Sequence, residues 1–531
     1  MSAAHGSGIP EQTLLAAAAR YERALREDDL AVLDEVFADG SSTLRAEGGA
    51  ALVGHADVSA HRARRGGAPA RWQRRVHVRA LGEADALTVS EAERLDGAGG
   101  LQTQLWHRFA DGWKVTAAHV SSAPAPSRAA HGTDRAAWRV RPGEGDPLLP
   151  GSGAGPLRGA RIAVKDLFAL AGQRIGAGVP AWLNQAPLET STAPAVQALL
   201  DAGSEVTGIA QTDELAFSLM GVNAHWGTPR NPAAPAHLPG GSTSGPAAAV
   251  AAGGADLGLG TDTAGSLRVP GSFCGLYAWR PSHGAVDTSG VLPLAPSFDT
   301  VGLLAADPAL LAVAADVLLP PRPAPAQAVR PAALLRSAAL LSLATPRTAL
   351  AVDAALTALA VQTGLPVREV DPDFSPEEPQ RWTAAFRTLQ AAEAWASHGE
   401  FIDAHPGALS PAVERRFRHG QGLAPEAVQA ARAVVERTRG RLEAVLADGW
   451  LCLPSTAAPA PRVDASAEEF EAARTGTLRL TTLASQTGVP ALNLPWGRVG
   501  ELPVGLCVLA PRGSDRSLLA LLAEVAPPRR A

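Results

Sequence analysis

Residues 163–166 (AVKD), 240–245 (GGSTSG) and 260–268 (GTDTAGSLR) are the stretches that decide how this chain folds and what it does. In the first, a lysine ends a short apolar run, where burial of a charged ammonium would be costly. In the second, glycines precede Ser242, which fits a flexible turn or a phosphate-binding loop. In the third, small residues before Ser266 let backbone N–H groups converge, as an oxyanion hole requires. Taken singly, each stretch also fits a purely structural role.

Common motifs of other enzyme classes are missing around these stretches. The loop at 240–245 lacks the G-x-x-x-x-G-K-[ST] form of a nucleoside triphosphate site, and Gly258 and Gly260 do not continue into G-x-G-x-x-G. No serine lies in a G-x-S-x-G elbow, which disfavours a Ser-His-Asp hydrolase of the usual α/β type.

The composition is that of a globular protein with a substantial core. The chain has 531 residues, of which 46% are hydrophobic and 19% charged, enough for two domains. A net charge of −5 offers no basic field for nucleic acid. Cys274, Cys452 and Cys507 lie far apart, so we expect no disulfide framework, no metal site and no cofactor. Without a signal-peptide pattern or a membrane-length apolar run, we expect a cytoplasmic protein with no membrane partner.

The first part of the chain has the pattern of a small α+β domain. Apolar residues keep helical spacing over 11–37, with a polar break at Asp28-Asp29. Alternating runs rich in β-formers follow at 72–79, 86–94, 101–109 and 113–120. The Pro/Ala/Ser-rich stretch 121–131 is typical of a linker. We therefore predict a first domain at 1–125, a linker at 126–156 and a second domain at 157–531.

From residue 157 onward, strand and helix patterns alternate. Strands are predicted at 161–164, 205–209, 492–495 and 504–509. Helices are predicted at 192–203, 245–254, 347–363, 379–400 and 423–447. This alternation predicts an α/β domain whose sheet is covered by helices.

Taken together, the three opening stretches resemble the amidase signature family. The match covers 157–320 and resumes at 478–509. The segments AVKDLF, TDELAFSLMGVNAHWGTPRNP, LPGGSTSG and VPGSFCGLYAWRPSHG resemble its plant-type branch, which includes indole-acetamide hydrolases and an amidase-like chloroplast import receptor. The resemblance implies an α/β/α fold around a large mixed sheet. It also implies hydrolysis of the C–N bond of a small-molecule amide.

The resemblance also implies the roles of three residues. The residue matching Ser266 attacks the amide carbonyl and forms an acyl-enzyme. The residue matching Ser242 lies on a cis peptide bond and relays the proton. The residue matching Lys165 accepts that proton in its uncharged form and returns it to the leaving amine. A serine hydroxyl needs such a base because it is a weak nucleophile.

The residues beside the second serine are expected to support it. Backbone N–H groups of Thr263, Ala264 and Gly265, together with that of the serine, would hold the oxyanion. Ala264 stands where many members of the family have glycine, and alanine avoids positive φ angles. Asp262 and Arg268 are expected to brace the loop rather than react.

The first domain resembles an NTF2-like fold, and more closely the AtzH-like family, one member of which acts on carboxylated ureas. YERALREDDLAVLDEVF and HRFADGWKVTAAHVS carry this resemblance, which covers 11–121. Tyr21 and Arg45 match pocket positions of that family and suit a ligand with a carboxylate. A core tyrosine beside a solvated arginine is the alternative. Because NTF2-like folds often pair through their sheets, we expect a homodimer.

Two other functions remain open at this point. A non-catalytic amidase-like scaffold is disfavoured because Lys165, Ser242 and Ser266 are all present. A glutamine-dependent amidotransferase subunit is disfavoured by the N-terminal fusion and by a poor fit to that subgroup's substrate loops. The acyl group is not indicated, since nothing in 380–420 suggests a charge clamp. Phe386, Trp395 and Phe417 there either line an apolar pocket or pack a lid.

Overall fold

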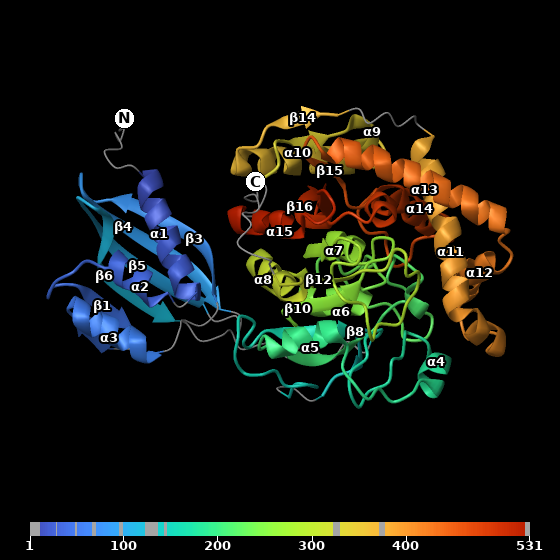
Figure 1. The fold of residues 1–531 in the computed structure, drawn as a ribbon, viewed down its shortest axis with the longest axis horizontal. Coiled ribbons are helices and arrows are strands. Elements are labelled where there is room, and N and C mark those ends of the chain that lie inside the picture. Colours follow the sequence, from blue (N-terminus) through green and yellow to red (C-terminus); the bar gives the residue numbers. More distant parts are fainter. Residues whose placement is uncertain are drawn as a thin grey trace. The chain divides into compact units, whose positions relative to one another are not determined.

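A computed structural model gives the fold (Figure 1). It describes residues 11–27, 29–47, 50–65, 71–94, 99–122, 136–142, 146–321, 330–370 and 377–525. The chain forms two compact units, Met1–Ala130 and His131–Ala531, and each is described by itself.

The first unit places three helices against a curved sheet, as its pattern predicts. The helices are α1 (Glu11–Glu27), α2 (Leu30–Val36) and α3 (His55–Arg65). The strands are β1 (Leu44–Glu47), β2 (Ala50–Val53), β3 (Arg71–Ala80), β4 (Asp85–Arg94), β5 (Gly99–Phe109) and β6 (Gly112–Ser122). Their order in the sheet is β2-β1-β6-β5-β4-β3; among these described strands β1 and β6 pair in parallel and all other neighbours pair antiparallel. The predicted polar break has a physical cause, because the side chain of Asp29 caps α2 by accepting from the N–H of Val32.

The second unit is built on one mixed sheet, in the order β14-β13-β15-β17-β16-β11-β12-β10-β8-β9-β7. Its strands are β7 (Trp138–Val140), β8 (Arg161–Lys165), β9 (Glu205–Ala210), β10 (Leu257–Thr261), β11 (Tyr277–Arg280), β12 (Val301–Ala305), β13 (Leu334–Arg336), β14 (Val367–Glu369), β15 (Trp450–Pro454), β16 (Ala491–Val499) and β17 (Leu502–Leu509). The central strands β10, β11 and β12 are buried along their whole length, as expected of a sheet that helices cover on both faces.

The helices of this unit either contact strands of the sheet or lie against other helices, and they form the α/β/α architecture that the resemblance implies (Figure 1). They are α4 (Pro180–Gln185), α5 (Pro194–Asp201), η1 (Glu214–Ala216), α6 (Ser244–Ala251), α7 (Arg268–Cys274), α8 (Pro308–Leu318), α9 (Ala338–Leu341), α10 (Pro346–Thr363), α11 (Glu378–Ala404), α12 (Pro411–Gln421), α13 (Pro425–Leu446), α14 (Ala467–Thr487) and α15 (Asp515–Glu524). Contacts link α11 to α12, α13 and α14, so these four helices form one group. In the part of the chain that the structure describes, no helix has the length and apolarity needed to cross a membrane.

The segment predicted as a linker, 126–156, is only partly a connection. Residues 123–135 and 143–145 lie outside the described residues. Trp138–Val140, however, forms β7 and pairs antiparallel with β9 at one edge of the large sheet. Three residues are too few for an alternating pattern to reveal a strand, which is why the sequence did not predict it.

The order of the strands brings two chemically important residues together. β8 and β10 are neighbours and run parallel, with Val164 opposite Leu259. Lys165 ends β8 and Thr261 ends β10. Because the carboxyl ends of parallel strands meet at one edge of a sheet, both side chains reach the same place.

Candidate active site

Lys165 is fully buried and surrounded by hydroxyl groups. Its Nζ lies 2.9 Å from Ser242 Oγ, 3.2 Å from Thr243 Oγ1 and 2.8 Å from Thr261 Oγ1. No carboxylate among the described residues forms an ion pair with it. The ammonium form therefore lacks the counter-ion that a buried charge requires.

Burial lowers the pKa of Lys165 to about 7. The negative charges of Asp213, Asp262 and Asp299 act in the opposite direction but do not cancel the loss of hydration. A lysine with this pKa is substantially uncharged at neutral pH and can accept a proton.

The two serines named from the sequence lie next to each other and next to the lysine. The Oγ atoms of Ser242 and Ser266 are 3.1 Å apart, and both side chains are buried. The Gly241–Ser242 peptide bond is cis. Lys165, Ser242 and Ser266 thus form a continuous series of hydrogen-bonded groups, although they come from three separate segments.

Asp213 holds the loop around Ser242 and was not identified from the sequence. Its carboxylate accepts from Ser244 Oγ at 2.9 Å and from the N–H of Gly221 at 3.0 Å. A side chain at Gly241 would collide with this carboxylate, so glycine is required there. Burial raises the pKa of Asp213.

Backbone N–H groups near Ser266 are arranged differently from the expectation. The N–H of Gly265 donates to Asp262 Oδ1 at 2.9 Å, so it is not free to hold an oxyanion as predicted. The N–H groups of Thr263, Ala264 and Ser266 make no hydrogen bond to another described residue. These three groups remain the candidate oxyanion donors.

The substitution of glycine by Ala264 does not disturb this loop. The positive φ angle, 122°, belongs to Gly265. A Cβ atom at Gly265 would also lie 2.9 Å from Thr481 Cβ of α14, which is too close. Conformation and space therefore both require glycine at 265 and permit alanine at 264.

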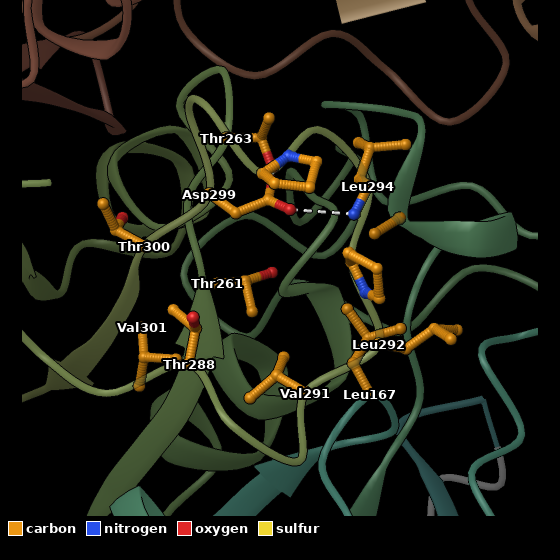
Figure 2. A pocket seen from close by; sticks show the side chains of 13 residues that line it. Leu167, Thr261, Thr263, Thr288, Val291, Leu292, Leu294, Asp299, Thr300 and Val301 are labelled. Atoms are coloured by element: carbon orange, nitrogen blue, oxygen red, sulfur yellow. Dashed lines mark hydrogen bonds between the residues drawn. The ribbon is translucent and has the colours of Figure 1, made fainter. Parts of the chain in front are cut away.

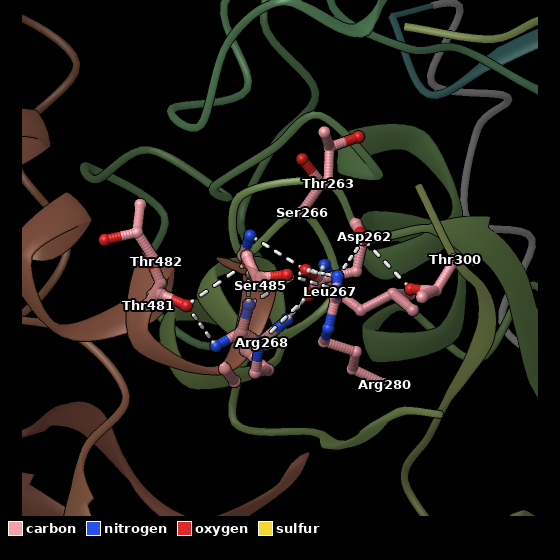
Figure 3. A network of polar contacts seen from close by, with 12 residues as sticks. Asp262, Thr263, Ser266, Leu267, Arg268, Arg280, Thr300, Thr481, Thr482 and Ser485 are labelled. Carbon is pink, nitrogen blue, oxygen red and sulfur yellow. Dashed lines mark hydrogen bonds and ion pairs between the residues drawn. The ribbon is translucent and has the colours of Figure 1, made fainter. Parts of the chain in front are cut away.

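A buried ionic network braces the loop, as expected for Asp262 and Arg268 (Figure 3). Arg268 makes a two-pronged contact with Asp262, through Nε at 3.0 Å and Nη2 at 2.9 Å. Arg280 adds a third contact at 3.0 Å. Burial alone would raise the pKa of Asp262, but the two guanidinium charges hold it well below its ordinary value. The network reaches α14 because Arg268 Nη1 donates to the carbonyl of Thr481 at 2.8 Å.

A cavity of about 80 Å³ adjoins the site (Figure 2). Thr261 and Thr263 line it together with Asp299 and a wall of apolar residues that includes Leu292 and Val301. Asp299 accepts from Thr263 Oγ1 at 2.6 Å and from the N–H of Leu294 at 2.8 Å. Neither Ser242 nor Ser266 lines the cavity, so the cavity lies beside the hydrogen-bonded series and does not enclose it.

In the first unit, Tyr21 and Arg45 are both buried and face each other. The Tyr21 hydroxyl accepts from Gln102 Nε2 at 2.8 Å and from Arg45 Nη1 at 3.4 Å. Arg62 is also buried, lies over the Phe37 ring at 4.0 Å, and has Nε and Nη2 atoms without a partner among the described residues. Arg45 is therefore not the solvated arginine of the alternative interpretation.

Comparison with known proteins decides the family of the chain. A model of the family described as amidase matches residues 144–519. This chain belongs to the amidase family. It is a hydrolase that acts on C–N bonds of amides, like the amidases to which it is similar. A second model, described as AtzH-like, matches residues 11–125 of this amidase-family chain.

Relatives agree with this assignment. The amidase-family chain is 33% identical over 407 residues to Amidase 1 of Arabidopsis thaliana, covering 72% of this chain and 95% of that protein. It is 31% identical over 389 residues to Translocon at the outer membrane of chloroplasts 64 of Pisum sativum, covering 69% of this chain and 65% of that protein. Among solved structures, a crystal structure of an amidase has a TM-score of 0.62 and 31% identity, covering 69% of this chain and 84% of that one.

Proposed function

We propose that this chain hydrolyses a small-molecule amide through an acyl-enzyme on Ser266, with Ser242 and Lys165 as a proton relay. The observation that carries the proposal is the hydrogen-bonded series Lys165 Nζ, Ser242 Oγ and Ser266 Oγ, with separations of 2.9 Å and 3.1 Å. Each separation permits direct transfer of a proton.

In the first half of the reaction, Ser266 Oγ attacks the carbonyl carbon of the amide. Its proton passes to Ser242, and the proton of Ser242 passes to Lys165 Nζ, so the two transfers leave Ser242 neutral. The tetrahedral oxyanion is held by the N–H groups of Thr263, Ala264 and Ser266. The proton on Lys165 then returns through Ser242 to the leaving nitrogen, the C–N bond breaks, and the amine departs.

In the second half, water takes the place of the amine. The relay removes a proton from the water, whose oxygen attacks the ester carbonyl of the acyl-enzyme. The ester C–O bond breaks, Ser266 recovers its proton, and the carboxylic acid product leaves. Lys165 ends each half uncharged, so it needs a pKa near 7 in both.

Labelling with a fluorophosphonate tests the proposal directly. We expect the purified full-length chain to form one covalent adduct, located on Ser266 by peptide mass spectrometry. The Ser266→Ala variant should remain unlabelled, whereas a variant of an exposed serine, Ser289→Ala, should be labelled like the parent. A non-catalytic scaffold would give no adduct. An amidotransferase subunit would give an adduct but release ammonia from glutamine rather than from the aryl, alkyl and ureido amides of a substrate screen.

For the first unit, we propose that Tyr21 and Arg45 bind a small molecule with a carboxylate. The support is the buried, cationic surrounding of the Tyr21 hydroxyl, to which Arg45 and Arg62 both contribute. Guanidinium groups in such surroundings bind carboxylates well. The other role open to this unit is pairing of two chains through its sheet into the homodimer we expect.

Calorimetric titration with malonate or oxalate separates these roles. We expect Arg45→Met to weaken binding at least about tenfold, because charged hydrogen bonds of this kind contribute that much. Arg79→Met, which alters an exposed arginine of β3, should bind like the parent. If neither Arg45→Met nor Tyr21→Phe changes the titration, the pocket is not a ligand site. The molar mass measured by analytical ultracentrifugation would then show whether this unit serves to form a homodimer.

A further inference from the structure

Three arginines from three different helices lie within electrostatic reach of one another: Arg387 of α11, Arg416 of α12 and Arg474 of α14. The Arg474 side chain is only 7% exposed. Its Nη1 pairs at 2.7 Å with Glu471, which is half exposed, and its buried Nε has no partner among the described residues. A buried guanidinium with an unused N–H group is unusual, since such groups are nearly always paired.

Arg416 is the second cation of this group, and its hydrogen-bond partner is a backbone carbonyl rather than a carboxylate. Its Nη1 donates to the carbonyl of Phe217 at 2.8 Å, and no carboxylate of the described residues forms an ion pair with it. Burial lowers the pKa of Arg416 to about 10, and the charge of Arg474 lowers it further than any other neighbouring charge does. Two positive charges thus lie close together, with the half-exposed Glu471 carboxylate paired to Arg474 and the buried Asp213 carboxylate acting on Arg416 without forming an ion pair with it. Such an arrangement favours a bound anion.

The loop and the helix that hold these arginines also form the candidate active site. Phe217 belongs to the loop in which the carbonyl of Leu219 accepts from the N–H of Gly241 at 2.8 Å, one residue before Ser242. Arg474 lies seven residues before Thr481 on α14, which is two turns and about 10 Å along the same helix face. Thr481 is the residue that contacts Gly265 beside Ser266.

Apolar side chains pack beside both the nucleophile loop and the helix that carries Arg474. One buried cluster contains Ala264, which precedes Gly265, together with Leu219, Phe386 and Leu478. Leu478 lies one turn after Arg474 on α14. Charges act more strongly in such surroundings because they are poorly screened.

We propose that Arg416 and Arg474 bind a carboxylate on the acyl part of the substrate. The favoured substrates are then monoamides of short dicarboxylic acids, with the scissile carbonyl at Ser266 and the free carboxylate at the two guanidinium groups. The inference rests on the proposed function and names its substrate class. The sequence between 380 and 420 did not indicate a charge clamp because the two cations come from α12 and α14, 58 positions apart in the chain.

Matched pairs of substrates test the proposal in the full-length chain. Malonamate, succinamate and glutaramate are compared with propanamide, butanamide and pentanamide through ammonia release. We expect kcat/KM for at least one carboxylate to exceed that of its neutral partner by at least about tenfold. In Arg416→Gln this ratio should fall at least about tenfold, chiefly through KM, because the lost contact serves binding. Arg381→Gln, which alters an exposed arginine of α11, should keep the parent ratio.

The outcomes separate this proposal from the catalytic one. Suppose that Ser266 is labelled and neutral amides are hydrolysed. If the ratio of kcat/KM for the carboxylate to kcat/KM for its neutral partner is then below one, or is the same in Arg416→Gln as in the parent, only the carboxylate site is wrong. If no amide is hydrolysed and Ser266 is not labelled, the proposed function itself fails. Arg474→Gln should behave like Arg416→Gln. If Arg474→Gln folds poorly, binding of succinate is compared between Ser266→Ala and the double variant Ser266→Ala/Arg416→Gln. The double variant should bind succinate more weakly, and this test needs no turnover.

Discussion

Ser266→Ala should lower kcat at least about 10⁴-fold on every amide that the parent hydrolyses, because removal of the nucleophile of a coupled triad abolishes covalent catalysis. The fold should persist, since among the residues that the structure describes the Ser266 hydroxyl forms a hydrogen bond only with Ser242. Ammonia release measures the first effect, and circular dichroism with thermal unfolding measures the second. Ser289→Ala provides the matched control.

Residual turnover would be informative. A variant with folded spectra that kept more than about a hundredth of the parent kcat would show that another group attacks the carbonyl, because the oxyanion donors and substrate binding alone leave far less. The candidate closest at hand is Ser242, and Ser242→Ala in the same background would then identify it.

A lysine acting as an uncharged base makes activity fall with acidification. With a pKa of about 7, Lys165 is increasingly protonated below neutral pH and cannot accept the relayed proton. We expect kcat/KM to fall by about tenfold per pH unit well below pH 7 and to level off above it. The pH profile of ammonia release from a neutral amide measures this effect, since such a substrate does not itself titrate.

Replacing the lysine gives the second large effect. Lys165→Arg should be as inactive as Lys165→Ala, with kcat lower by about 10² to 10⁴, because arginine stays charged throughout this range. Lys114→Arg is a natural control, since Lys114 is the other lysine of the chain and pairs with Asp111 at the surface. Substantial turnover by Lys165→Arg would exclude an uncharged base at this position.

Much of the fold was predictable from local patterns. The strands predicted at 161–164 and 205–209 became β8 and β9, and the helices predicted at 347–363 and 379–400 became α10 and α11. These elements are long or regular enough for apolar spacing to define them. The short edge strands β7 and β14 have three residues each, and no periodicity can be recognised over that length.

The candidate site was predictable only where its chemistry is local in sequence. Ser242 and Ser266 lie in small-residue loops that can be read directly. Arg280 and Thr481 could not be linked to them, because their contacts with the loop depend on how distant elements meet in space. The bond from the Gly265 N–H to Asp262 lies within the loop, but the position of the Asp262 carboxylate depends on Arg280, which lies outside the loop, so this bond could not be foreseen either.

The bond from Arg268 to the carbonyl of Thr481 has a consequence for when the nucleophile loop is first braced. It spans 213 residues, and a ribosome adds about 5 to 20 residues per second, so roughly 10 to 40 s pass between synthesis of the nucleophile loop and of the helix that braces it. Contacts of such long sequence separation also form slowly after synthesis. During translation the nucleophile loop therefore lacks this brace until α14 has left the ribosome and docked.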